Sequence, residues 1–144
     1  MSRCMSNLLF LVLLLGLSLL FEPAAAQAEK RFFLQNATRY PISVTLLVPN
    51  NSGGWHVDGW WHVAPYSYKK VKFVFANASG RHFGVYAHTR HGGGKVWQGS
   101  GNAPNITVIS QGFSYDRRYS PPGGTNRRVV KVRMVQGDTY RFLE

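Results

Sequence analysis

The chain has 144 residues, one cysteine and a formal net charge of +11. Hydrophobic residues make up 44% and aromatic residues 14%, a composition too apolar for a disordered basic tail. The single cysteine excludes an internal disulfide framework and a cysteine-rich zinc site, and the length is that of one domain.

The first predicted element is a secretory signal peptide over residues 1–28. Arg3 lies in a short polar start, residues 8–21 are almost entirely apolar, and small residues follow. This order is typical of a signal peptide, and the apolar run is shorter than the roughly 20 residues that span a bilayer. An uncleaved membrane anchor is the alternative. The candidate cleavage residues are Ala24, Ala26 and Ala28.

Cleavage after Ala26 or Ala28 would leave residues 29–144 as a single predicted β domain. It removes one basic and one acidic residue, so the net charge of the remaining chain is still +11. It also removes Cys4, so no thiol remains. We therefore expect an exported protein, periplasmic or extracellular, with no transmembrane segment after cleavage.

The rest of the chain is predicted to form strands, because its apolar residues alternate with polar ones. This alternation indicates strands with one buried face and one face in water. The candidate ranges are 32–36, 42–48, 55–63, 70–75, 82–88, 95–98, 105–110, 130–134 and 139–143. Turn-forming clusters separate them at 49–54, 77–80, 92–94 and 121–124. About seven to nine short strands without a helix predict an all-β fold, an antiparallel β-sandwich or a small barrel.

The segment 55–63 contains three of the four tryptophans. In one extended strand, the face predicted to be buried would carry Trp55, Val57, Trp61 and Val63. The opposite face would carry His56, Asp58, Trp60 and His62. Gly59 could bend or bulge the strand and change this register.

The same segment carries a family resemblance. Gly54-Trp55 followed by Gly59-Trp60-Trp61-x-Val63-x-Pro65 resembles the hallmark of small secreted bacterial proteins catalogued as domain of unknown function 1036. The further matches, which extend the resemblance over about residues 32–113, are Asn36, Val85-Tyr86-Ala87 and Trp97-Gln98-Gly99. Gln35 and Tyr68 stand where the family often has cysteines, so the family disulfide would be absent, and Tyr66 replaces a turn glycine. The resemblance implies an exported β domain and supplies no activity.

The histidines offer one candidate chemistry. Neutral imidazoles on neighbouring strands can bind zinc or copper, with Asp58 as a further ligand. If a metal binds, its ligands would be His56, His62, His82 and His88. No spacing matches a metal motif, so we predict no cofactor. The mature chain has few carboxylates, and Gln98-Gly99-Ser100-Gly101 lacks a nucleophile elbow, so no catalytic residue is assigned.

Basic residues offer the stronger candidate chemistry. Arg117-Arg118 and Arg127-Arg128 flank a Pro/Gly-rich tip, and in a hairpin-like loop both pairs would meet on one patch. Arginine binds carboxylate, phosphate and sulfate with two parallel hydrogen bonds. A second basic group consists of Lys69, Lys70 and Lys72. The aromatic and polar residues expected on the surface are Trp60, His62, Tyr86 and Tyr119.

These patterns predict a non-catalytic binding module of unknown molecular function. Its partner would be an anionic envelope or extracellular component, such as a glycan, a lipid headgroup or nucleic acid outside the cytoplasm. Two other hypotheses are a metal-dependent or hydrolytic enzyme on the histidine-bearing strands and a protein–protein inhibitor or assembly accessory. A basic surface that only keeps the domain soluble is the simplest alternative.

Overall fold

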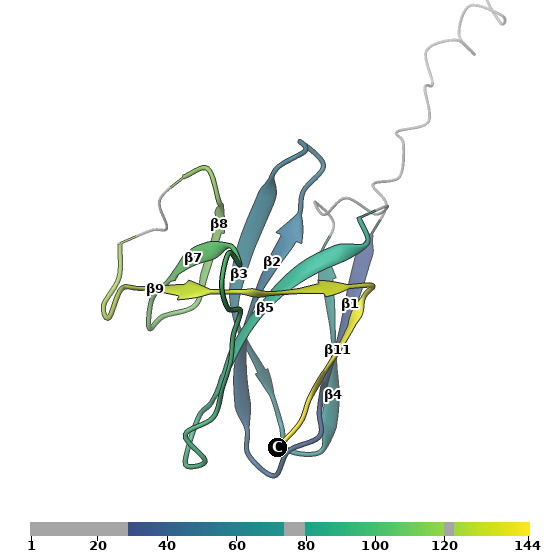
Figure 1. Cartoon of the computed structure of the whole chain (residues 1–144), viewed down its shortest axis with the longest axis vertical. Coiled ribbons are helices and arrows are strands. Elements are labelled where there is room, and N and C mark those ends of the chain that lie inside the picture. The colour runs from purple at the N-terminus through teal and green to yellow at the C-terminus, as the bar shows by residue number, and fades with distance from the viewer. Residues whose placement is uncertain (1–28, 74–79, 120–122) are drawn as a thin grey trace, which may run out of the picture.

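The computed structural model describes residues 29–73, 80–119 and 123–144, which form eleven strands and no helix (Figure 1). The strands are β1 (Lys30–Asn36), β2 (Ile42–Pro49), β3 (Trp55–Val63), β4 (Ser67–Phe73), β5 (His82–Thr89), β6 (Val96–Trp97), β7 (Asn105–Val108), β8 (Phe113–Asp116), β9 (Arg128–Lys131), β10 (Arg133–Gln136) and β11 (Thr139–Phe142). The predicted signal peptide and its cleavage residues lie outside the described residues. The part described holds no helix long and apolar enough to cross a membrane.

The strands form two sheets and a two-stranded ribbon. The three-stranded sheet has the order β11-β1-β4, and the six-stranded sheet has the order β10-β5-β2-β3-β8 with β6 beside β5. The ribbon consists of β7 and β9. Every pairing is antiparallel except that of β1 with β11, which is parallel. The predicted all-β class is confirmed, and the described strands close no barrel.

The two sheets and the ribbon stack as three layers. Between the sheets lies a core that includes Phe32, Leu34, Val44, Leu46, Phe83, Val85 and Phe142. On the other face of the six-stranded sheet, a second core includes Leu47, Val57, Tyr86, Ile106, Phe113, Val130 and Val132. The chain that runs from β9 into β10 crosses the six-stranded sheet in Figure 1, and its residues Val130 and Val132 pack in this second core.

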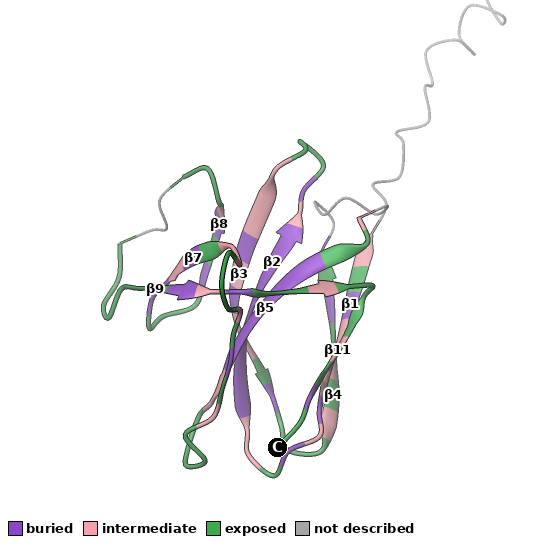
Figure 2. Cartoon of the chain, viewed as in Figure 1, coloured by how far each residue is buried: buried purple, intermediate pink, exposed green. Residues whose placement is uncertain are grey.

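The ribbon explains why β2 and β5 are buried on both faces (Figure 2). The expectation of one solvent-facing side is therefore wrong for these two strands. There are also more strands than expected. The candidate 130–134 divides at Val132 into β9 and β10, and β8 lies partly in the segment predicted to be a loop. The alternation of Phe113 and Tyr115 with Ser114 and Asp116 is the signal for β8 that was overlooked.

Strand β3 contains a bulge at Trp60. Thr45 lies opposite Gly59 while Val44 lies opposite Trp61, so Trp60 has no partner on β2. The Gly59–Trp60 peptide bond is cis. Because the bulge shifts the register, Val57 packs in the second core and Val63 in the first. The predicted bulge is confirmed, and the predicted four-residue faces of segment 55–63 are wrong, because an extra residue reverses the alternation.

Thr45 supplies a stability prediction. Its side chain is fully buried, and its Oγ1 atom has no hydrogen-bond partner among the described residues. Thr45→Val should raise the free energy of unfolding by about 1 kcal/mol, because it removes an unsatisfied buried hydroxyl. The control is Thr38→Val, which removes a hydroxyl that donates to Asn36 Oδ1 over 2.9 Å and should destabilise the protein. Urea denaturation at 25 °C measures the free energy of unfolding of both variants. An equal loss of stability in both would contradict the assignment of the Thr45 hydroxyl as unsatisfied.

Candidate functional site

Three of the four predicted arginines line one cavity. This arginine pocket has a volume of about 270 Å³ and is lined by Asn105, Thr107, Tyr115, Arg117, Arg118, Tyr119 and Arg127. Arg128 is absent from this lining and instead lines a second cavity. The two arginines are neighbours at the start of β9, where successive side chains of an extended chain point in opposite directions. Arg128 therefore does not share a cavity with the other three arginines.

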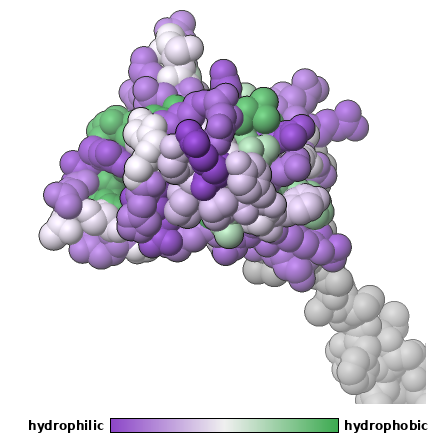
Figure 3. Space-filling view, turned by 90° about the horizontal axis from the view of Figure 1, so that it is seen from below, coloured by the Kyte–Doolittle hydropathy of each residue, from purple (hydrophilic) through white to green (hydrophobic). Residues whose placement is uncertain are grey.

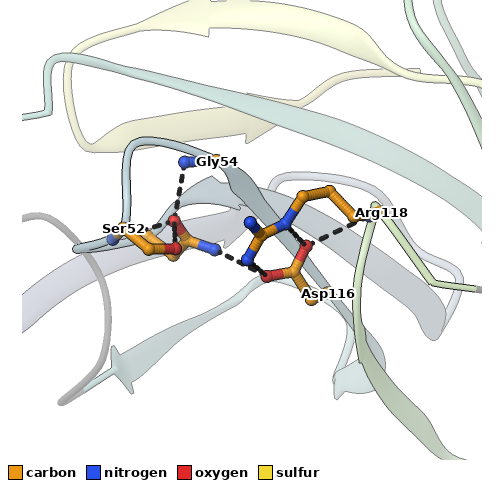
Figure 4. Close-up of polar contacts among 5 residues, drawn as sticks. Ser52, Gly54, Asp116 and Arg118 are labelled. Atoms are coloured by element: carbon orange, nitrogen blue, oxygen red, sulfur yellow. Dashed lines mark hydrogen bonds and ion pairs between the residues drawn. The ribbon is translucent and has the colours of Figure 1, made fainter.

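A turn between β2 and β3 holds one side of the arginine pocket (Figure 4). Asn50 Oδ1 accepts hydrogen bonds from the backbone N–H groups of Ser52 and Gly54, and Asn50 Nδ2 donates to Asp116 Oδ2 over 3.1 Å. Asp116 in turn binds the Arg118 guanidinium with two hydrogen bonds, of 3.2 and 3.0 Å. Asp116 is therefore the ion partner of Arg118.

The three arginines of the pocket are not equally available to bind an anion. The hydrogen bonds from Arg118 lower the pKa of Asp116, and the same contact raises the pKa of Arg118. The Arg118 charge is thus largely matched by a carboxylate. Arg117 and Arg127 form no ion pair with another described residue. They are the two cations that the pocket can present to an incoming anion.

Hydrogen bonds between strands hold the residues at the base of the arginine pocket in place. The Tyr115 hydroxyl donates to the Thr107 carbonyl oxygen over 2.8 Å and accepts from the Thr107 N–H over 3.0 Å, which ties β8 to β7. Arg117 Nε donates to the Asn105 carbonyl oxygen over 3.3 Å. Burial raises the pKa of Tyr115, so its hydroxyl stays protonated at neutral pH. Tyr119 is 67% exposed at the mouth, as expected for a surface aromatic residue.

A larger cavity, the Trp60 groove, lies on the same face of the six-stranded sheet as the ribbon. It has a volume of about 610 Å³ and is lined by Ser43, Trp60, His62, His88, Arg90, Ile109, Ser110, Gly112, Asn126 and Arg128. Ser43 lies directly opposite His62 on β3 and opposite His88 on β5. The three side chains therefore form one cross-strand row, next to the part of the sheet that the ribbon covers.

Trp60 forms a fixed wall of the groove. Its indole N–H donates to the Ile109 carbonyl oxygen over 2.8 Å. Its ring meets the rings of His88 and Phe113 edge-on, with centroids 5.2 and 5.6 Å apart. The bulge in β3 turns Trp60 toward the second core, so an irregularity in the strand builds the groove.

The polar groups of the groove are also engaged. Ser43 Oγ lies 3.0 Å from His62 Nδ1, and His88 Nδ1 lies 2.9 Å from the Thr89 carbonyl oxygen. Burial lowers the pKa of His62, and the charges of Arg90, Lys69 and His88 lower it further. No lining residue is acidic. Ser43 and His62 form a serine–histidine pair, but no acidic residue of the described lining orients the imidazole. The hydrolytic alternative therefore stays a prediction.

The other predicted site residues lie elsewhere. Tyr86, expected on the surface, is 3% exposed because the ribbon covers it, and the Arg128 guanidinium lies 5.7 Å from its ring centre. The lysines Lys69, Lys70 and Lys72 are on β4 in the three-stranded sheet and line neither cavity. Lys69 Nζ donates to the His62 carbonyl oxygen, and Lys72 pairs with Glu29.

The four histidines do not converge. His62 and His88 share the Trp60 groove, whereas His56 Nε2 lies 2.7 Å from Ser114 Oγ and His82 lies opposite Gln136 at the other end of β5. Asp58 accepts a hydrogen bond from the Trp61 indole. Within residues 29–73, 80–119 and 123–144, no group of three or more His, Cys, Asp or Glu side chains could hold a metal ion.

Sequence reasoning missed Ser43 and Arg90. Ser43 and Thr45 interrupt the apolar residues of β2, a faint signal that the second face of this strand carries polar groups. Comparisons of the chain with protein-family models, curated proteins and solved structures found no match.

Proposed function

We propose that this protein is an exported, non-catalytic module that binds an anionic component of the cell envelope or the extracellular space. The observation that supports this proposal is the convergence of Arg117, Arg118 and Arg127 on one cavity with exposed Tyr119 at its mouth. Guanidinium groups bind phosphate, sulfate and carboxylate through paired hydrogen bonds. An aromatic ring beside them can stack on a sugar or a base.

The net charge favours a polymer over a small ion. A charge of +11 concentrates polyanions near the surface, and hydrophilic side chains cover most of the face seen in Figure 3. Interactions of this kind weaken with salt, because mobile ions screen exposed charges beyond about 10 Å at 0.1 M. Glycan phosphates, acidic sugars, lipid headgroups and nucleic acid present the same chemistry to the arginine pocket.

Retention on anionic supports tests the proposal. Purified protein should bind heparin, anionic lipid vesicles or DNA at low salt and elute as salt rises. Arg117→Ala/Arg127→Ala should elute at markedly lower salt, because it removes the two pocket cations that lack an ion pair. The matched control, Arg81→Ala/Arg141→Ala, removes the same charge outside the pocket and should elute close to the unmodified protein. Failure to retain the protein on any support at low salt, or equal shifts in both variants, would refute the proposal.

A further inference from the structure

We propose that the Trp60 groove is a second binding site, and that its ligand is a sugar ring bearing an oxyanion, either a carboxylate or a phosphate. This inference goes beyond the proposed function, because it concerns another cavity and a single sugar unit in place of a polymer. It does not require the arginine pocket to bind anything.

The two arginines of the groove select an anion. Arg90 follows β5 and Arg128 begins β9, so they reach the groove from different elements. Both are exposed, and neither forms an ion pair with another described residue. Because none of the described residues that line the groove is acidic, an entering oxyanion meets positive charge without a competing carboxylate from them.

The rest of the lining fits the body of a sugar. The volume of about 610 Å³ lies within the range of small-molecule sites. Trp60, fixed by its hydrogen bond to Ile109, offers an apolar surface for ring C–H groups. Asn126 Nδ2 donates to Ser110 Oγ over 2.9 Å, which places an amide and a hydroxyl at the rim. These groups can exchange hydrogen bonds with sugar hydroxyls.

The histidines make the site sensitive to pH. His62 and His88 face the groove, and the other charged groups near them are Arg90 and Arg128 from the lining and Lys69 from β4. Burial, followed by the charges of Arg90, Lys69 and His88, disfavours the protonated imidazole of His62 in the free protein. A bound anion offsets this effect and raises the pKa of His62, so binding takes up protons. Affinity for a sugar carboxylate, whose own charge is constant over this range, should therefore rise as the pH falls from 8 to 5.5.

Calorimetric titration with four sugars tests the site. The probes are galacturonate and glucose 6-phosphate, which carry the two oxyanions, and galactose and glucose, their neutral counterparts. We expect at least one acidic sugar to bind more than tenfold tighter than its neutral counterpart. We expect galacturonate, whose charge does not change between the two pH values, to bind more tightly at pH 5.5 than at pH 8. The comparison between the two acids distinguishes a carboxylate ligand from a phosphate ligand.

Variants locate the binding in the groove. Arg90→Ala should weaken the binding of the acidic sugar about tenfold or more, since a charge-assisted hydrogen bond is lost. His62→Gln should reduce the pH dependence while the protein stays folded, as circular dichroism would confirm. Arg141→Ala removes an exposed arginine from the three-stranded sheet and should change neither property. If no acidic sugar binds at about 10 mM and pH 5.5, if Arg90→Ala binds unchanged, or if the sugar is chemically altered, the inference is wrong.

Discussion

Asn36→Ala is expected to lower the free energy of unfolding by about 3 kcal/mol or more, since each buried polar group left without a partner costs about 1–3 kcal/mol. Asn36 is fully buried at the end of β1. Its amide nitrogen donates to the carbonyl oxygens of Tyr40, Val63 and Ala64, over 2.8, 3.3 and 2.9 Å. Its Oδ1 atom accepts from the N–H and the hydroxyl of Thr38. One side chain thus joins β1, the turn after it and the end of β3.

The chemistry of the amide makes this prediction specific. Asn36→Asp preserves the volume and the acceptor but removes the donating nitrogen, so it should also destabilise the protein strongly. Asn102→Ala makes the same truncation at an exposed residue and should change the free energy of unfolding by less than about 0.5 kcal/mol. Urea denaturation at 25 °C measures all three variants. A loss below about 1 kcal/mol for Asn36→Ala would show that the network contributes little to stability.

Gln35→Cys/Tyr68→Cys is expected to form a disulfide that raises the free energy of unfolding by about 3–4 kcal/mol. Gln35 on β1 lies directly opposite Tyr68 on β4. Directly paired residues on antiparallel strands have Cα atoms about 4.5–5.5 Å apart, a separation that a disulfide can span. The bond would restrict the unfolded chain by closing the loop between these two residues.

The gain is measured as the difference between urea denaturation curves recorded with and without a thiol reductant. Mass spectrometry of the oxidised protein establishes the cross-link, and the two single-cysteine variants control for the loss of each side chain. The reduced double variant should be close in stability to the unmodified protein, because Tyr68 is 65% exposed. A cross-linked protein with unchanged stability would contradict the expected effect on the unfolded state.

Local patterns were sufficient for most strands. The predicted ranges 32–36, 55–63 and 139–143 correspond closely to β1, β3 and β11, because alternation and turn residues are properties of short segments. Alternation also identified the buried face of β5, where Phe83, Val85 and Ala87 lie in the first core. It did not identify the ribbon as a third layer, since nothing in β2 or β5 indicates what will pack on the opposite face.

The positions of the candidate site residues depend on which strands pair and in which register, and the sequence alone does not determine this pairing. The basic character of residues 117–128 was evident, but the direction of each arginine depended on where β9 begins. The row of Ser43, His62 and His88 exists only because β2 lies between β3 and β5 in a particular register. The bulge at Trp60 then assigns His56 and His62 to different faces of the sheet, so four similar histidines divide among separate environments.

The lysines of β4 have a consequence for self-association. Among the described strands, β4 pairs only with β1, so its other backbone edge is open. Positive charge along this edge comes from three lysines, Lys69, Lys70 and Lys72. The Nζ atom of Lys69 lies 5.7 Å from the centre of the Trp61 ring. If two molecules approached edge to edge, their lysines would come into close opposition and repel each other before a continuous ladder could form. The positive charge of these lysines therefore protects the open edge against aggregation.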